Sequence, residues 1–251
     1  MRYFICLSYN GSAFSGWQIQ ENANSVQAEL QKALSTLFKT PIQVVGAGRT
    51  DTGVNARNYI AHFDYNGTIP SEPHTVYKLN AILPKQISVH SVYPVSDQMH
   101  ARFSALSRTY KYYIHTEKDP FCSEFSYFVP ARKLNFEKMN LACQYFLGEQ
   151  DFSSLEKVNG GNKTSICNVT HASWEPIGND IPTQYVFTVT ANRFLRNMVR
   201  AMVGSLLEVG SGKREPEWIK EMLARKNRSA AGHSVPGNAL FLVNVEYPIE
   251  A

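Results

Sequence analysis

Two hydrophobic periods alternate in the first half of the chain. Residues 2–9 alternate apolar and polar side chains, which is typical of a half-buried strand. Apolar residues then recur at helical spacing over 26–37, directly after Asn24 and Ser25, which are favoured at helix N-caps. The same reasoning predicts a helix over 74–82 and strands over 42–45, 59–65, 87–93 and 109–115.

A second series of elements follows Pro130. The pattern predicts helices over 136–147, 194–207 and 218–223, and strands over 167–174, 185–190 and 240–247. Strands and helices do not alternate regularly along the chain, as they would in a doubly wound parallel sheet. We therefore expect an α+β fold with mainly antiparallel strands.

The two series suggest two halves that meet near residues 100–108. We place the boundary after residue 104, giving an N-terminal half, 1–104, and a C-terminal half, 105–251. A cleft between two such halves is a common place for a substrate.

Composition indicates a globular protein of the cytoplasm. At 251 residues and 43% hydrophobic content, the chain can bury a substantial core. Its four cysteines form no C-x-x-C pair, and its first residues resemble neither a signal peptide nor a membrane span. We therefore expect reduced thiols and no membrane association.

Positive charge is concentrated near the C-terminal end of the chain. The formal net charge is only +4, yet residues 193–228 contain nine basic residues against four glutamates. A localised excess of this kind favours a polyanionic partner more than the net charge does.

The most unusual stretch is the turn GAGRTDTG at residues 46–53, which lies between two predicted strands. Its glycines permit unusual backbone conformations and close approach of a ligand. Arg49, two positions before Asp51, can hold that carboxylate ionised, as a nucleophile or base requires. Alternatively Asp51 only caps a turn and Arg49 is solvated, and taken alone the turn favours this interpretation.

Nucleotide and metal chemistry have little support in the sequence. The glycine spacing differs from the dinucleotide fingerprint, and no phosphate-loop lysine motif occurs. The seven histidines form no H-E-x-x-H motif and have no acidic partner at ligand spacing. We therefore expect neither a nucleotide cofactor nor a catalytic metal.

Two further patterns are compatible with RNA binding. Strand alternation over 107–114 puts Arg108, Tyr110 and Tyr112 on one face, which suits stacked bases and phosphates but equally suits a tyrosine-rich core. In the predicted helix 194–207 and just before it, Arg193, Arg196 and Arg200 follow the spacing i, i+3, i+7 of one helix face. That face would bind phosphates or simply be solvated.

Together these segments resemble the tRNA pseudouridine synthase A family, over residues 9–248. Five blocks occur in the family's order, and such an ordered set is far more specific than any one block. The blocks are YNGSAFSGWQ at 9–18, GRTDTGV at 48–54, RFSALSRTYKY at 102–112, FLRNMVRAMVG at 194–204 and LFLVNVEYP at 240–248.

The resemblance implies a pseudouridine synthase fold, with two α/β halves around a mainly antiparallel central sheet and the active-site cleft between them. It also implies roles for individual side chains. Asp51 would be the catalytic carboxylate with Arg49 beside it, and Arg200 its partner. Tyr110 would stack on the target base and act in deprotonation, and Leu240 would form a wall of the base pocket.

The implied reaction converts uridine to pseudouridine at positions 38, 39 and 40 of tRNA, in the anticodon stem-loop, without a cofactor. Family members work as homodimers that hold one tRNA jointly. Asn10, Asn55 and Ala239 stand where aspartate, histidine and glycine are common, which bears on RNA contacts rather than on the reaction.

Two rival functions remain open from the residues. A non-catalytic RNA-binding protein on the same fold would retain the basic residues and the tyrosine strand. A phosphate-loop nucleotide enzyme would need a lysine that the sequence lacks.

Overall fold

The computed structural model describes residues 1–69, 71–130, 134–157, 164–178 and 183–248. The chain forms two compact units, one made of Met1–Leu106 together with the chain from Leu242 onward, the other of Ser107–Phe241. The division at residue 104 into independently organised halves stays a prediction.

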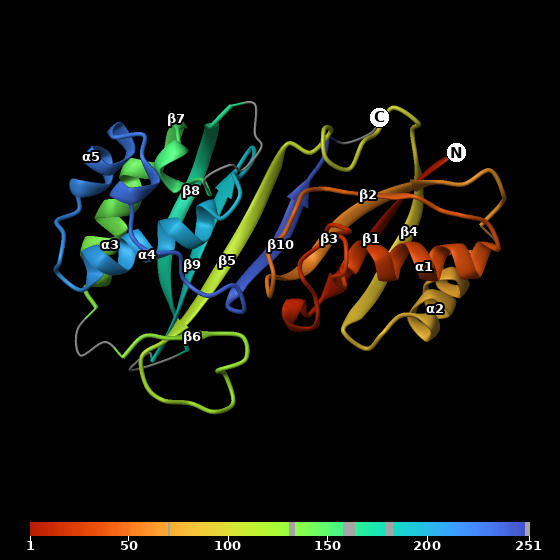
Figure 1. Cartoon of the computed structure of the whole chain (residues 1–251), viewed down its shortest axis with the longest axis horizontal. Coiled ribbons are helices and arrows are strands. Elements are labelled where there is room, and N and C mark those ends of the chain that lie inside the picture. Colours follow the sequence, from red (N-terminus) through yellow and green to blue (C-terminus); the bar gives the residue numbers. More distant parts are fainter. Residues whose placement is uncertain (70, 131–133, 158–163, 179–182, 249–251) are drawn as a thin grey trace. The chain divides into compact units, whose positions relative to one another are not determined.

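The first unit is built on antiparallel strands (Figure 1). Strand β1 (Arg2–Tyr9) pairs with both β3 (Asn55–Asp64) and β4 (Ile87–Val95), and β2 (Val44–Gly46) pairs with β3. Two helices, α1 (Val26–Phe38) and α2 (Glu72–Ile82), contact each other and these strands. Part of the last strand, β10 (Leu240–Glu246), also belongs here.

Helix α1 shows how the sequence specifies its own element. The Ser25 hydroxyl accepts a hydrogen bond from the backbone N–H of Ala28, which caps the first turn. Val26, Leu30 and Leu34 recur on one face and are buried, so the predicted apolar stripe faces the core.

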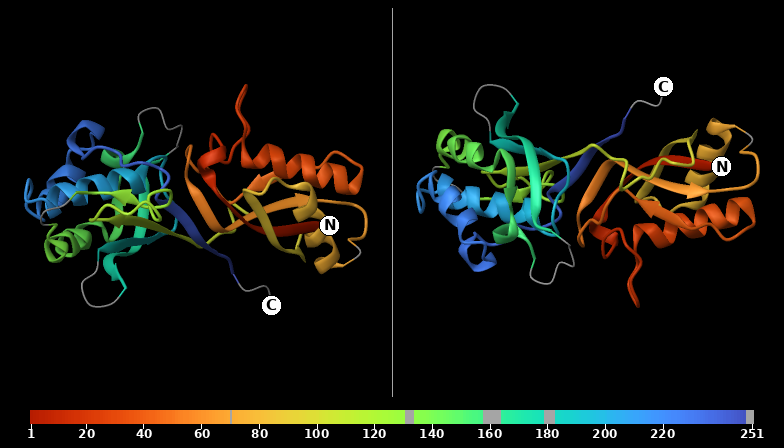
Figure 2. Two further views of the ribbon diagram at one scale, coloured as in Figure 1. Left: turned by 90° about the horizontal axis from the view of Figure 1, so that it is seen from below. Right: turned by 90° about the horizontal axis from the view of Figure 1, so that it is seen from above.

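In the described part of the second unit, antiparallel strands follow the order β5 (Ser107–His115), β9 (Gln184–Ala191), β8 (Ile166–Ile177) and β7 (Gly148–Asp151). A two-residue strand, β6 (Tyr127–Phe128), pairs with β5 in parallel. Helices α3 (Phe136–Cys143), α4 (Met198–Gly210) and α5 (Trp218–Ala224) gather on one side of these strands (Figures 1 and 2).

The predicted α+β class with mainly antiparallel strands is confirmed. Each predicted helix and strand is present near its expected position, whereas the short strands β6 and β7 had no prediction. Within the described ranges, short 3-10 helices at Gly11–Ala13, Gln144–Phe146, Ser153–Leu155 and Arg228–Ala230 were also not foreseen. In the part of the chain that the structure describes, no helix is both long and apolar enough to cross a membrane.

One helix boundary was predicted wrongly, with consequences for the arginines near it. The helix expected over 194–207 begins only at Met198, because Asn197 adopts a left-handed conformation with φ 69°. A left-handed residue cannot belong to a right-handed helix, so residues 192–197 form a loop before α4.

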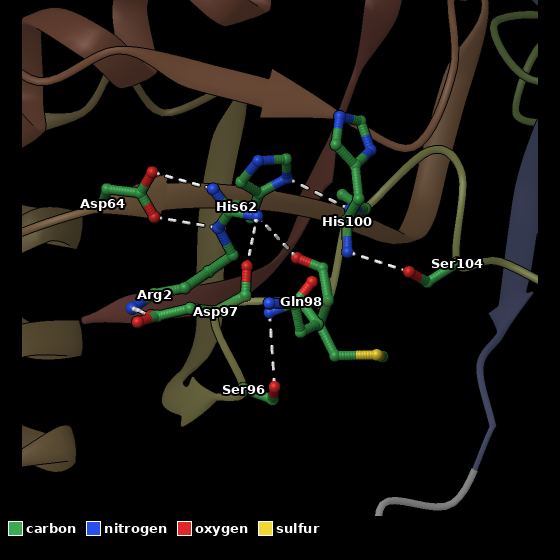
Figure 3. A network of polar contacts seen from close by, with 10 residues as sticks. Arg2, His62, Asp64, Ser96, Asp97, Gln98, His100 and Ser104 are labelled. Carbon is green, nitrogen blue, oxygen red and sulfur yellow. Dashed lines mark hydrogen bonds and ion pairs between the residues drawn. The ribbon is translucent and has the colours of Figure 1, made fainter.

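A polar network joins the start of β1 to the segment that follows β4 (Figure 3). The Arg2 guanidinium donates two hydrogen bonds of 2.8 Å to the carboxylate of Asp64, its neighbour across the β1–β3 pair. Its remaining Nη1 donates to the backbone carbonyls of Asp97 and Met99, each at 3.0 Å. Arg2 thus fixes the chain that leads out of β4.

His62 lies beside this network and is buried, with 4% of its surface exposed. Its Nδ1 accepts a hydrogen bond from the backbone N–H of Ala101 at 3.1 Å, so this nitrogen carries no proton and the ring is neutral. Burial, together with the positive charge of Arg2 and the proximity of His100, lowers the pKa of His62 from 6.5 to about 4.

This lowered pKa predicts acid sensitivity of the fold. Unfolded, the imidazole binds a proton below pH 6.5, whereas folded it stays neutral down to about pH 4, so stability is lost as pH falls through that window. Between pH 7 and pH 5 the loss should be about 2 kcal/mol. In urea unfolding at both pH values, His62→Gln should show a correspondingly smaller drop than the parent.

The matched control is His74→Gln, since His74 is exposed on α2. That variant should retain the parent's full loss of stability between the two pH values. An equal loss in the parent and His62→Gln would contradict the assignment of the acid sensitivity to His62.

Candidate functional site

Asp51 lies in the loop that joins β2 to β3. The loop closes with hydrogen bonds from Ala47 N–H to the Ile60 carbonyl at 2.9 Å and from Val54 N–H to the Asp51 carbonyl at 3.1 Å. The turn closed by the hydrogen bond from Val54 to Asp51 requires a positive φ, and Gly53 supplies it with φ 77°. The Asp51 side chain is half-exposed and Arg49 is exposed, so a ligand can reach both.

Two stacked aromatic residues form the floor of this loop. Tyr59 of β3 is fully buried, and its hydroxyl donates to the backbone carbonyl of Gly48. The Trp17 indole stacks on the Tyr59 ring with centroids 4.1 Å apart. A side chain at Gly46 would overlap the Tyr59 hydroxyl and the Trp17 indole, so this position of the motif accommodates only glycine without rearrangement.

Residues 9–17 hold the loop from the side. The Tyr9 hydroxyl and the Thr50 hydroxyl share a buried hydrogen bond of 2.9 Å, and Trp17 N–H donates to the Thr50 carbonyl at 3.3 Å. Gly16, with φ 99°, lies so close that a Cβ there would overlap the Thr50 carbonyl oxygen. The residue next to Asp51 is therefore fixed through both its side chain and its backbone.

Asn55 fixes the other end of the loop. It is 1% exposed, and its Oδ1 accepts a 2.8 Å hydrogen bond from the Gly11 N–H. Gly11 in turn approaches the Val54 carbonyl too closely for a side chain. Asn10 caps the short 3-10 helix of residues 11–13 by accepting from Ser12 N–H. Both departures from the family pattern thus have a structural role in this chain.

In the second unit, the structure separates the tyrosines that strand alternation placed together. Tyr112 is fully buried and its hydroxyl donates to the Pro236 carbonyl at 3.0 Å, which agrees with the alternative of a tyrosine packed in the core. Tyr110 is half-exposed and packs edge-on against Phe194, with ring centroids 5.1 Å apart. Arg108 donates from Nη1 to the Asn192 carbonyl at 2.8 Å.

Arg200 lies in the first turn of α4, where a neighbouring segment fixes its side chain. Its Nε donates to the Val235 carbonyl at 2.7 Å, and Val235 N–H donates back to the Arg200 carbonyl at 3.3 Å. The segment reaches α4 because Gly204 leaves room for the His233 carbonyl, which a side chain there would overlap. The guanidinium plane is thereby oriented before any ligand binds.

The proposed helix face of three arginines does not exist. Arg193 and Arg196 lie in the loop before α4, the first half-exposed and the second exposed, and only Arg200 is on the helix. Their spacing therefore does not put them on one helical stripe. Leu240, at the start of β10, is 5% exposed, and Ala239 before it is fully buried.

Sequence reasoning missed several residues that shape these two regions. Asn55 was noticed only as a departure, and Tyr59 only as a strand residue, although its hydroxyl supports the loop. The contribution of Val235 could not be read from any motif. A usable signal was the pair Gly204 and Gly232, because glycines in or facing a helix often permit close backbone contact.

Thiols and metal ligands contribute little to either region. Burial raises the pKa of Cys143 to about 12 and that of Cys167 to about 11, which disfavours the reactive thiolate. Among the residues that the structure describes, no group of three or more histidine, cysteine or acidic side chains could hold a metal ion.

Comparison with known proteins agrees with the blocks that surround these side chains. A family model described as tRNA pseudouridine synthase matches residues 142–248. Proteins named tRNA pseudouridine synthase A match almost the whole chain. The one from Parabacteroides distasonis is 51% identical over 249 residues, covering 99% of this chain and 97% of the relative.

Further relatives of the same name occur in Bacteroides thetaiotaomicron, 49% identical with coverage of 98% and 91%, and in Aliivibrio salmonicida, 39% identical with coverage of 100% and 94%. Identity at this level over nearly full length leaves no large segment of either chain unmatched. This chain therefore belongs to the tRNA pseudouridine synthase A family.

Proposed function

We propose that this protein isomerises uridine to pseudouridine in the anticodon stem-loop of tRNA, at positions 38, 39 and 40, with Asp51 as the catalytic carboxylate. It acts in the cytoplasm as a homodimer and needs no cofactor. The observation that carries the proposal is the half-exposed carboxylate of Asp51, held on a loop whose neighbours Thr50 and Val54 are fixed by buried contacts.

The reaction breaks the bond from N1 to C1′, turns the uracil, forms a bond from C5 to C1′ and moves the C5 proton to solvent while N1 gains one. No atom is gained or lost overall. One carboxylate suffices for this, because no water has to be activated as in glycoside hydrolysis. Asp51 either attacks C1′ or takes the C2′ proton to give a glycal, and both routes require it ionised.

Arg200 supplies the positive charge that keeps Asp51 ionised once the bound base excludes water, and Arg49 assists. In such a site an unpaired carboxylate would raise its pKa and lose reactivity. The fixed hydrogen bond from Arg200 Nε to the Val235 carbonyl supports this role, because it orients the guanidinium before the substrate arrives.

Tyr110 and Leu240 receive the target base. Extracting a base from its stack costs on the order of a few kcal/mol, and stacking on an aromatic ring returns part of that. The half-exposed ring of Tyr110, braced edge-on by Phe194, suits this task, and Tyr110 also assists removal of the C5 proton. Leu240 gives the pocket an apolar wall. Arg193 and Arg196 bind phosphates of the tRNA from the loop before α4.

The catalytic role of Asp51 can be tested with a change that keeps its shape. Asp51→Asn should lower turnover by about 10⁴-fold or more, because the amide is neither a nucleophile nor a base. The assay measures tritium released from tRNA labelled at C5 of uridine, without added metal or nucleotide. The affinity for tRNA should stay within a few-fold of the parent.

Asp119→Asn is the matched control, since it makes the same chemical change in the second unit and should leave turnover unchanged. Appreciable tritium release by Asp51→Asn would exclude Asp51 as the catalytic carboxylate. A parent protein that binds tRNA but releases no tritium would favour the non-catalytic RNA-binding function.

The role of Arg200 predicts that its loss affects catalysis more than folding. Arg200→Gln should lower kcat by about 10²- to 10³-fold, whereas the lost hydrogen bond to Val235 should cost only about 1 kcal/mol of stability. Turnover at saturating tRNA and urea unfolding of the same preparation measure the two effects. A loss of activity fully explained by unfolding would contradict this role.

A phosphate contact by Arg196 predicts a different signature. Arg196→Gln should weaken tRNA binding and reduce the slope of log Kd against log salt concentration by about 1, with kcat unchanged at saturating tRNA. Filter binding over a series of salt concentrations measures the slope. If the slope equals that of the parent, Arg196 is only a solvated side chain.

A further inference from the structure

The segment after β4 displays an aromatic ring on the surface of the first unit. Phe103 is 77% exposed, unlike the buried aromatic residues of the core. The Arg102 guanidinium carbon lies 5.6 Å from the centroid of the Phe103 ring, and the His100 ring lies 4.4 Å from it. Phe103 and Arg102, here called the 102–103 platform, therefore combine an aromatic face with a cation.

Side chains from other parts of the first unit hold the backbone beneath this platform. Arg2 donates to the carbonyls of Asp97 and Met99, and His62 accepts from the N–H of Ala101 (Figure 3). The Tyr247 hydroxyl donates to the Ala101 carbonyl at 2.6 Å. Both polar groups of the Ala101 backbone are thus bound by side chains from other parts of the unit.

The platform itself is fixed by local hydrogen bonds. His100 Nδ1 accepts from the N–H groups of Arg102 and Phe103, at 3.1 and 3.2 Å. His100 N–H donates to the Ser104 hydroxyl at 2.9 Å, and Leu106 N–H donates to the Glu246 carbonyl at 2.8 Å. These hydrogen bonds order the backbone that carries the exposed ring before any ligand binds. Binding a ligand there therefore costs little backbone conformational entropy.

Charge distinguishes the possible ligands. Arg2 engages the carboxylates of Asp64 and Asp97, through its guanidinium and its backbone N–H respectively. The side chain at the platform is the cation Arg102. An aromatic face beside a cation matches a nucleotide, whose base stacks while its phosphate is bound.

We propose that the 102–103 platform is an additional RNA-binding site, at which Phe103 stacks on an unpaired base of the tRNA and Arg102 binds the adjoining phosphate. Neither Phe103 nor Arg102 is among the residues assigned to catalysis and base binding. The proposal rests on the proposed function, because it takes tRNA to be the ligand.

Substitutions at Phe103 test the stacking. Phe103→Ala should weaken tRNA binding about tenfold or more and raise KM similarly, with kcat unchanged at saturating tRNA. Phe103→Leu, which stays apolar but lacks a π face, should lose as much, whereas Phe103→Tyr should bind like the parent. Retention of affinity by Phe103→Leu or Phe103→Ala would overturn the stacking contact.

Phe121→Ala is the matched control, because Phe121 is 95% exposed in the second unit and has no role in the proposal. Its affinity for tRNA should equal that of the parent. An equal loss from Phe121→Ala and Phe103→Ala would show a general effect of exposed rings and would overturn a specific platform.

The phosphate contact of Arg102 is tested by the salt dependence of binding. Arg102→Gln should reduce the slope of log Kd against log salt concentration by about 1, and Arg102→Lys should restore it.

A fluorescent reporter observes the contact directly. The three native tryptophans, Trp17, Trp174 and Trp218, are at most 8% exposed, so acrylamide should quench them poorly. In Phe103→Trp the new indole should be quenched readily in the free protein and protected when tRNA is bound. In Phe121→Trp the bound and free proteins should be quenched alike. An unprotected indole at 103 would overturn the proposal.

Sedimentation separates RNA binding from an interface between two copies of the chain. Phe103→Ala should sediment like the parent without tRNA, and a shift from dimer to monomer would overturn the proposal in favour of a protein interface. Failure of the proposed function would give a different experimental result. In that case the parent releases no tritium, whereas a failed platform leaves the parent active and the Phe103 variants equally tight in binding.

Discussion

The close backbone contact between residues 11–16 and the loop that follows β2 is the constraint on which the rest of the site depends. Gly16 meets the Thr50 carbonyl and Gly11 meets the Val54 carbonyl, at separations that exclude a Cβ. Asp51 lies between these two contacts in the chain, so its backbone has little freedom. The physical link explains why the blocks at 9–18 and 48–54 occur together. The first block supports the second through these contacts.

The second unit uses the same device to orient a different side chain. Gly204 of α4 admits the His233 carbonyl, and Gly232 N–H donates to the buried Ser205 hydroxyl at 3.0 Å. The chain that continues from there presents the Val235 carbonyl to Arg200. In both units a close contact at a glycine thus fixes the backbone near a charged side chain, Asp51 in the first unit and Arg200 in the second. Such preorganisation lowers the cost of reaching a reactive geometry.

Periodicity predicted the helices and strands well because most of them bury one face, as α1 does with Leu30 and Leu34. It failed where a single backbone conformation decided the outcome. With Asn197 in a left-handed conformation, helix α4 starts at Met198, four residues after the predicted start, and nothing in hydrophobic spacing reports a positive φ. Alternation likewise placed Tyr110 and Tyr112 on one face, but it could not tell which part of that face is covered. The segment around Pro236 buries Tyr112 and leaves Tyr110 accessible, which is a tertiary effect.

Strand β1 connects the two regions of the first unit that are proposed to meet RNA. Its last residue, Tyr9, bonds to Thr50 beside Asp51, and its first, Arg2, clamps the carbonyls that precede the 102–103 platform. Because β1 pairs on both sides with β3 and β4, its length and register are fixed. The spacing between Tyr9, which bonds to the Asp51 loop, and Arg2, which bonds to the segment before the platform, is therefore set by hydrogen-bonded strand geometry. For a nucleic acid that makes both proposed contacts, β1 would set the distance between them.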